Sequence, residues 1–281
     1  MPTSPEVLPL FATAPGAPHV CCTWCQERKP KPEVLKLRDW EVSAEQLTPE
    51  WFAARKDRVT ASEMASVLSE GGMSRIELLR KKCGLSDRQM DAFGQAACDH
   101  GRKHEDGAIA RFEQQTGHRV LPFGLLVDPE RPSIGASPDG ITYCGICIEV
   151  KCPYNRTIRP GEIPARYVSQ VQCQLFVSGL QKAAFVQWGV FDDTFDITYV
   201  DPDEDWWVDN CGKIVSFYHQ MLEVRQDKSK IVKYERRKKS PSSGSGSPPN
   251  HRKRPPPVNT LCKGFNFILE DDDDYNSASM R

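Results

Sequence analysis

The 281-residue sequence has no long apolar run and almost no net charge. No stretch approaches the roughly 20 consecutive apolar residues that a transmembrane helix needs, so we expect no membrane partner. The formal net charge is −1, because 37 Lys and Arg residues stand against 38 Asp and Glu residues. Total charge therefore indicates no class of partner, and any binding surface must come from local clustering of side chains.

We also expect no secretory signal from the first residues of the sequence. The first twenty residues, MPTSPEVLPLFATAPGAPHV, have neither the basic start nor the continuous apolar run of a signal peptide. The cysteines number eleven, which is odd and does not suit a complete set of disulfides. We therefore expect an intracellular protein whose thiols are mostly reduced.

No internal repeat is present, and composition divides the chain into three parts. Residues 1–38 are rich in proline and lack a sustained periodicity, which predicts a disordered N-terminal arm. Residues 232–281 are first basic and rich in Ser, Gly and Pro, then acidic, which predicts a disordered tail. Such segments bury too little surface to offset the entropy of ordering. We expect only residues 39–231 to fold as a domain.

Helix and strand patterns alternate within residues 39–231. Thr48 is the predicted cap of one helix and Ser62 of another, while a long helix from about Ser86 to Thr116 ends at Gly117. Further helices are predicted at about 164–179 and 204–226, and strands at about 120–127, 134–141, 146–151, 183–191 and 197–200. This order of elements is typical of an α/β layer fold.

The stretch GASPDGITYCGICIEVKCP places charged residues in an otherwise apolar strand. If the strands on either side of Cys144 and Gly145 form a hairpin, Asp139 lies opposite Glu149. Because side chains alternate along a strand, Glu149 and Lys151 then point to the same face as each other. A solvated strand face would give the same alternation, but the hairpin brings all three charges to one spot.

Two adjacent carboxylates repel each other unless a cation lies between them. A hard divalent ion such as Mg²⁺ relieves the repulsion, accepts oxygen ligands and lowers the pKa of a bound water. A neighbouring lysine can orient that water or stabilise phosphate charge. Asp139, Glu149 and Lys151 thus supply the parts that hydrolysis of a phosphodiester requires.

Glu105 adds a third carboxylate. It shares one helical face with Ile109 and Phe112, where a charge is costly unless it is paired or binds a metal. The alternative is a glutamate at the helix edge, satisfied by Arg102 or Arg111.

Five blocks of the sequence occur in a characteristic order and spacing. They are WFAARKDRVTASE, HGRKHEDGAIARFEQQTG, GASPDGI, IEVKCPY and YVSQVQCQLFV, at 51–63, 100–117, 135–141, 148–154 and 167–177. In that order and spacing they resemble phage lambda exonuclease and the YqaJ-type viral recombinase nucleases, within the PD-(D/E)xK superfamily. The resemblance implies a restriction-endonuclease-like core, in which a central mixed β-sheet is flanked by helices.

Residue roles follow from the resemblance by position. It implies that the metal ligands are Glu105, Asp139, Glu149 and the backbone carbonyl of Val150. Lys151 would position the attacking water, and Gln172 would hold the nucleophile or the scissile phosphate. Three residues match positions that contact DNA, notably its 5′-phosphate, and they are Arg55, Ser62 and Ser137. Asp128 matches a further acidic position after a shift of one residue.

The activity implied is Mg²⁺-dependent digestion of double-stranded DNA from its 5′ end, with Mn²⁺ as a substitute metal. The product is a 3′ single strand for annealing or recombination, and some members of the family form a homotrimer around DNA. Two alternatives stay open, an endonuclease on the same core and a catalytically silent DNA-binding scaffold. Lys56 and Asp57 replace apolar and small residues of the phage enzyme, so the pocket for the 5′ end is expected to differ.

The cysteines and the tail add three further expectations. Zinc is not expected, because the two C-x-x-C pairs, Cys22 with Cys25 and Cys144 with Cys147, are far apart in the sequence. The acidic end FNFILEDDDDY is interpreted either as a docking segment for a single-strand annealing or binding protein, or as a solubilising tail. The basic residues of the tail predict a bipartite nuclear import signal, which indicates a eukaryotic DNA virus or a gene derived from one. These residues are Arg236, Arg237, Lys238, Lys239, Arg252, Lys253 and Arg254.

Overall fold

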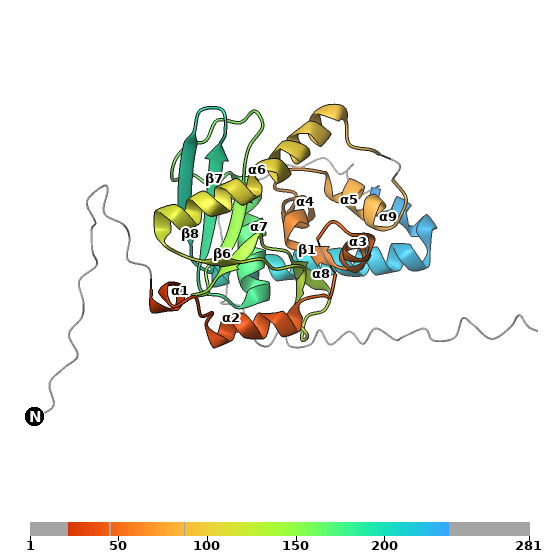
Figure 1. Ribbon diagram of the computed structural model, residues 1–281. Helices are drawn as coiled ribbons and strands as arrows, with labels where there is room; N and C mark the ends of the chain where they lie inside the picture. The colour runs from red at the N-terminus through yellow and green to blue at the C-terminus, as the bar shows by residue number, and fades with distance from the viewer. Residues whose placement is uncertain (1–21, 45, 87, 236–281) are drawn as a thin grey trace, which may run out of the picture.

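The computed structural model describes residues 22–44, 46–86 and 88–235, and a mixed β-sheet lies at the centre (Figure 1). Five strands form this sheet in the order β2-β5-β6-β7-β8. β6 and β7 are parallel, and the other neighbouring pairs are antiparallel. The strands are β2 (Val120–Leu121), β5 (Gly140–Thr142), β6 (Cys147–Lys151), β7 (Ala183–Gly189) and β8 (Thr194–Val200). The predicted central mixed sheet is therefore confirmed.

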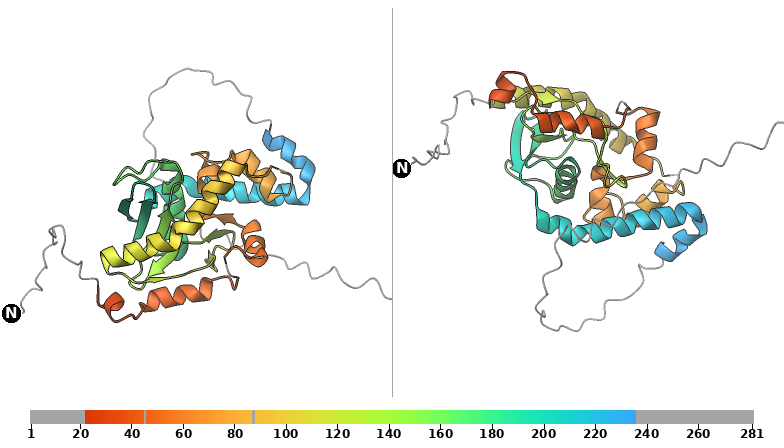
Figure 2. Two further views of the ribbon diagram at one scale, coloured as in Figure 1. Left: turned by 45° about the horizontal axis from the view of Figure 1, so that its top comes forward. Right: turned by 90° about the horizontal axis from the view of Figure 1, so that it is seen from below.

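Helices cover both faces of this sheet, as Figures 1 and 2 show. α6 (Ala92–Thr116) crosses one face, and α7 (Ala165–Ser178) packs on the other, where it makes the crossover between the parallel strands β6 and β7. α8 (Glu204–Gln226) lies beyond α7. Ile148 and Val150 of β6 are buried against α6, which leaves the alternate residues of β6 facing α7.

The predicted hairpin has the expected register. Gly140 pairs with Ile148 and Ile141 with Cys147, so Asp139 falls opposite Glu149. The predicted strand 134–141 is wrong in extent, because the chain changes sheets at Pro138, which lacks an N–H for the ladder.

The first half of that predicted strand belongs to a second sheet. β4 (Ile134–Ala136) lies between β1 (Val59–Thr60) and β3 (Leu126–Val127) there. The predicted strand 120–127 likewise divides into β2 and β3, which belong to different sheets. The second sheet brings the segment around β1 next to the residues that precede β5.

Helix capping confirms one of the sequence predictions and corrects another. Thr48 accepts a hydrogen bond from the Trp51 N–H at 3.3 Å and opens α3 (Pro49–Lys56), as expected. The second predicted cap is wrong, because Thr60 rather than Ser62 stands at the start of the turn η2 (Ala61–Glu63). There the Glu63 carboxylate accepts from the Thr60 N–H at 3.0 Å. α4 (Met64–Leu68) follows.

The long helix starts later than its composition indicated. Asp91 accepts from the Gly94 N–H at 2.7 Å, so α6 begins at Ala92 rather than near Ser86. Its end at Gly117, where φ is +71°, is confirmed. α5 (Arg75–Lys82), which Ser74 caps, was not predicted from the sequence.

Part of the predicted N-terminal arm packs on the domain. Residues 22–40 include α1 (Thr23–Gln26), α2 (Pro32–Lys36) and η1 (Leu37–Trp40), and Val34 and Leu37 are buried in the main core. These two apolar residues, three positions apart, form a small helical face that the surrounding prolines conceal in the sequence.

After α8 the chain continues through η3 (Lys228–Lys230) and α9 (Ile231–Glu235), where Glu235 forms an ion pair with Arg80 at 2.5 Å. The predicted import signal and the acidic end lie outside the described residues. None of the helices within residues 22–235 that the structure describes is both long and apolar enough to cross a bilayer.

Candidate active site

Three charged side chains meet where β5 begins and β6 ends. The Asp139 N–H donates to the Ile148 carbonyl at 3.0 Å, and Oδ2 of Asp139 accepts from the Val150 N–H at 2.6 Å. Nζ of Lys151 forms an ion pair with Oε1 of Glu149. The hairpin therefore brings Asp139, Glu149 and Lys151 together, as the sequence predicted.

Glu149 is a buried carboxylate, with only 1% of its surface exposed. Nε2 of Gln170 donates to its Oε1 at 2.6 Å, and Nε2 of Gln174 donates to its Oε2 at 2.5 Å. Buried charges need such partners, since an uncompensated carboxylate is costly in a protein interior. Gln170 and Gln174 are four residues apart and so share the face of α7 that packs on β6. They fix the orientation of the carboxylate.

Gln172, predicted to act at the site, lies elsewhere. It falls between the two glutamines that reach Glu149 and so projects from a different side of the helix. Its Nε2 donates to the Asp201 carbonyl at 3.0 Å, and its Oε1 accepts from the Asp203 N–H at 2.9 Å. Gln172 therefore stabilises the connection between β8 and α8. The spacing of Gln170 and Gln174 in QVQCQ was the signal that could have identified the two glutamines that donate to Glu149.

The two arginines considered above as partners for Glu105 form ion pairs with other carboxylates. Arg102 forms an ion pair with Asp99, and Arg111 forms one with Asp193. Burial raises the pKa of Glu105, while the charge of Lys151 opposes this shift and the charge of Glu149 adds to it. Because α6 packs against β6, Glu105 lies close enough to Glu149 and Lys151 for their charges to act on it, as expected for a third acidic residue at the site.

Electrostatics show an excess of negative charge at this site. Burial raises the pKa of Asp139 well above its usual range, and repulsion from Glu149 adds to the effect. Burial lowers the pKa of Lys151, but attraction to Glu149 and Asp139 outweighs it, so the pKa is raised and the amine stays cationic. One lysine thus faces three carboxylates, and a divalent cation would remove the remaining repulsion.

The donor set fits such a cation. Carboxylate oxygens are the ligands that Mg²⁺ and Mn²⁺ prefer, and Asp139, Glu149 and Glu105 supply them. The hydrogen bond from the Val150 N–H orients the Asp139 carboxylate. The role predicted for the Val150 carbonyl stays a prediction.

Arg55 anchors a second polar cluster. Its guanidinium donates to Oγ of Ser137 at 3.2 Å, to Oγ of Ser62 at 2.7 Å and to Oγ1 of Thr60 at 3.1 Å. The carbon Cζ lies 4.2 Å from the centroid of the Trp51 ring. The three residues predicted to bind DNA thus meet at one point, and Thr60 and Trp51 join them without having been predicted.

A buried lysine supports the Arg55 cluster. Nζ of Lys82 donates to the carbonyls of Arg55 and Arg58, both at 2.7 Å, and pairs with Glu63 at 2.9 Å. Burial lowers the pKa of Arg55, whereas the charges of Glu63 and Glu149 act in the opposite direction. Ser137, which accepts from Arg55, stands two residues before Asp139, so the Arg55 cluster lies next to the carboxylates.

The Asp128 carboxylate bonds to residues of the turn in which it lies. Its carboxylate pairs with Arg131 and accepts from the Glu130 N–H at 2.9 Å, between β3 and β4. These contacts account for its burial, since only 3% of its surface is exposed. The structure therefore gives Asp128 a structural role in this turn and does not support the acidic site position that was predicted for it.

Aromatic rings gather beside α6 and the end of β6, which also carry residues of the site. Phe93 and His100 lie on α6, Tyr154 follows β6, and Phe191 lies in the turn between β7 and β8. The His100 ring is 5.4 Å from Tyr154 and 5.3 Å from Phe191, and Phe191 is 75% exposed. Single-stranded nucleic acids stack their bases on surfaces of this kind. This cluster was not predicted from the sequence, because its members come from three separate segments.

Comparisons with known proteins agree with this geometry. Residues 50–181 match the YqaJ-like viral recombinase domain family. The chain is similar to the alkaline exonuclease LHK-Exo from Laribacter hongkongensis, with 28% identity and a TM-score of 0.54. The structure of LHK-Exo in complex with dAMP matches with 28% identity and a TM-score of 0.55. Each alignment covers 68% of this chain and 97% of LHK-Exo. A search of the curated proteins gave no match.

These similarities confirm the predicted restriction-endonuclease-like fold and the predicted nuclease relationship. Residues 50–181 therefore form a domain of the YqaJ-like viral recombinase family.

Proposed function

We propose that this protein is a divalent-metal-dependent deoxyribonuclease that digests duplex DNA from a 5′ end and leaves a 3′ single strand for annealing or recombination. We propose Mg²⁺ as its metal, with Mn²⁺ as a substitute. The observation that carries the proposal is the Arg55 cluster beside the carboxylates of the β5–β6 hairpin, since Arg55 donates a hydrogen bond to Ser137, two residues before Asp139. An anion-binding cluster next to a hydrolytic site is suited to a DNA end.

The carboxylate cluster would perform the hydrolysis. A divalent cation held by Asp139, Glu149 and Glu105 would supply a water of lowered pKa and neutralise phosphate charge. Lys151, kept cationic by Glu149 and Asp139, would hold that water or the non-bridging oxygens of the phosphate. Gln170 and Gln174 keep the Glu149 carboxylate in one orientation, so little reorganisation is needed during the reaction.

The Arg55 cluster would bind the terminal phosphate. A guanidinium makes short, charge-assisted hydrogen bonds to phosphate oxygens, and the hydroxyls of Ser62 and Ser137 add neutral donors. The guanidinium donates to the oxygens of those hydroxyls, which keeps the three side chains together. A terminal phosphate carries more charge than an internal one, which favours binding at an end and therefore exonuclease action over internal cutting.

The aromatic cluster of Phe93, His100, Tyr154 and Phe191 supports a role for single-stranded DNA at the site. The rings of Phe93, Tyr154 and Phe191 are exposed, and the cluster lies beside α6 and the end of β6, which carry Glu105 and Lys151. Stacking on aromatic rings tolerates any base, as digestion of an arbitrary sequence requires.

The proposal is tested on linear duplex DNA with one 5′-phosphorylated end and a label on the opposite 3′ end. The purified full chain is incubated with Mg²⁺, beside a covalently closed circle of the same sequence. We expect the strand with the 5′-phosphate to be digested while its complement and the circle stay intact. Chelation of the metal should stop the reaction, and renewed Mg²⁺ or Mn²⁺ should restore it.

A Lys151→Ala variant is the control for contaminating nucleases, and it should be inactive. Cutting of the circle would favour an endonuclease on the same core. Binding of DNA without loss of either strand would favour a silent scaffold, and digestion from the 3′ end would refute the polarity.

A further inference from the structure

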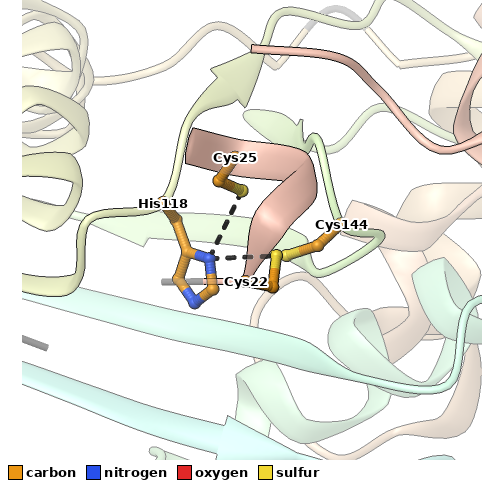
Figure 3. A group of neighbouring side chains, drawn as sticks. All are labelled: Cys22, Cys25, His118 and Cys144. Atoms are coloured by element: carbon orange, nitrogen blue, oxygen red, sulfur yellow. Dashed lines mark hydrogen bonds between the residues drawn. The ribbon is translucent and has the colours of Figure 1, made fainter. Parts of the chain in front are cut away.

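Three cysteines and one histidine from separate parts of the chain gather beside the sheet (Figure 3). We propose that Cys22, Cys25, His118 and Cys144 bind one Zn²⁺ ion with a structural role. Their ligand atoms, three Sγ and the Nδ1 of His118, all lie within 4.8 Å of one another. This set of four is independent of the carboxylates at the end of β6, so the inference does not rest on the proposed nuclease activity.

The distances suit a tetrahedral zinc site. Zn–S bonds of about 2.3 Å and Zn–N bonds of about 2.0–2.1 Å place a sulfur and a nitrogen ligand about 3.6 Å apart at the tetrahedral angle. Nδ1 of His118 lies 3.6 Å from Sγ of Cys25 and 3.4 Å from Sγ of Cys144. One imidazole therefore stands at zinc-ligand spacing from two thiols, as Figure 3 shows.

The structure corrects the sequence expectation about zinc in two respects. The predicted pairs are not far apart in space, because α1 lies against the turn between β5 and β6. The fourth member is also different: Cys147 is fully buried in the main core, and His118 takes its place. His118 directly follows the end of α6 at Gly117, where the sequence showed no metal pattern.

Backbone contacts hold the ligand segments together without help from the side chains. The Lys31 N–H donates to the Tyr143 carbonyl at 2.8 Å, and the Tyr143 N–H donates to the Arg119 carbonyl at 2.8 Å. The Cys25 N–H donates to the Cys22 carbonyl at 3.1 Å, which closes the C-x-x-C turn. The cluster is thus built on a fixed scaffold, as metal affinity requires.

Zinc binding fits this set of four side chains better than a disulfide or an iron–sulfur cluster does. None of the described cysteines is in a disulfide, and a disulfide has no use for the imidazole placed among the sulfurs. An iron–sulfur cluster contains several atoms between its protein ligands, and so needs ligands further apart than these. Four protein ligands also leave no open position for a substrate, which indicates a structural rather than a catalytic zinc.

The position of the site explains what the zinc would do. Cys144 lies in the turn of the hairpin that carries Asp139 and Glu149, and His118 follows the helix that carries Glu105. Zinc would therefore fasten the segment of α1 and α2 to both elements that hold the acidic residues.

The test measures metal in the full chain, purified without chelators, by inductively coupled plasma mass spectrometry. We expect about one zinc per chain. After the metal is removed under reducing conditions, Co²⁺ should give the visible absorption and the thiolate charge-transfer band of a tetrahedral Cys₃His site. The variants Cys22→Ser, Cys144→Ser and His118→Ala should lose most of the zinc.

Three further variants make the result specific. Cys98→Ser removes an exposed thiol on α6 outside the cluster and should keep the zinc. Asp139→Asn should also keep it, which separates this site from the carboxylates. His118→Cys restores a fourth ligand and should bind zinc where His118→Ala does not.

Four outcomes would overturn the proposal. They are wild-type protein without zinc and without the tetrahedral Co²⁺ spectrum, zinc that survives in all three ligand variants, iron in place of zinc, or a disulfide among these cysteines in mass spectra. The wild-type Co²⁺ spectrum decides the question even if a variant fails to fold.

Discussion

Replacing Gln174 with methionine should impair catalysis. Nε2 of Gln174 donates to Oε2 of Glu149 at 2.5 Å, and Gln174→Met removes this donor with little change in side-chain volume. A hydrogen bond to a charged group contributes about 1.5–3 kcal/mol. If that bond holds the Glu149 carboxylate in its reactive orientation, its loss lowers kcat/KM by roughly 10- to 150-fold, since 1.36 kcal/mol corresponds to a factor of ten.

The expected value lies near the lower end of that range. Lys151 and Gln170 still contact Oε1 of Glu149 in the variant, so the carboxylate keeps part of its support. Because Gln174 acts through Glu149, the variant should also require more Mg²⁺ for half-maximal activity. The assay is the loss of fluorescence from an intercalating dye during digestion of a linear duplex, with Mg²⁺ titrated.

Gln172→Met is the matched control. The Gln172 amide bonds to the backbone at Asp201 and Asp203, away from Glu149. This variant should melt at a lower temperature, because two hydrogen bonds of about 1 kcal/mol each are lost. Its kcat/KM below the melting transition should stay close to that of the wild type. A tenfold loss in Gln172→Met beside wild-type activity in Gln174→Met would refute the reasoning.

Further predictions concern the acidic site, the phosphate cluster and the tail. Burial and the neighbouring carboxylates raise the pKa of Asp139 in the folded protein. In the presence of a chelator, the folded state therefore loses stability as the pH rises from about 4, the usual pKa of an aspartate, through the raised pKa, because Asp139 must ionise. Asp139→Asn should therefore be inactive yet melt above the wild type at alkaline pH in chelator, and a lower melting temperature there would contradict this. Arg55→Gln should lower the rate on 5′-phosphorylated ends by about 10-fold or more relative to 5′-hydroxyl ends, because charge-assisted bonds to the phosphate are lost; equal loss on both ends would argue against the phosphate pocket. We also propose that residues 232–281 direct a fused fluorescent protein to the nucleus, where a diffuse cytoplasmic signal would count against import. Deletion of residues 264–281 should reduce capture of a single-strand annealing or binding protein in a pull-down, and unchanged capture would remove the docking idea.

Local rules made the centre of the active site predictable. Asp139, Glu149 and Lys151 belong to one hairpin, whose turn and alternation of side chains can be read from a short stretch of sequence. Thr48 and Gly117 were likewise identified correctly, since helix caps depend on a few neighbouring residues. The meeting of Arg55, Ser62 and Ser137 followed from the resemblance of separated blocks, because no local rule joins them.

Tertiary packing decided the rest. The rotation of α7 on the sheet selects Gln170 and Gln174 over Gln172, and a sequence does not fix that rotation. The change of sheets at Pro138 depends on which partner each short strand finds.

The Cys₃His cluster depends most of all on the tertiary structure. His118 is 93 residues from Cys25 along the chain, yet their ligand atoms are 3.6 Å apart. Contacts at that separation arise only when the whole domain has packed, because the intervening chain leaves the distance between the two residues free. The sequence by itself therefore determined the chemistry of one hairpin, and the packing of distant segments decided which other residues join it.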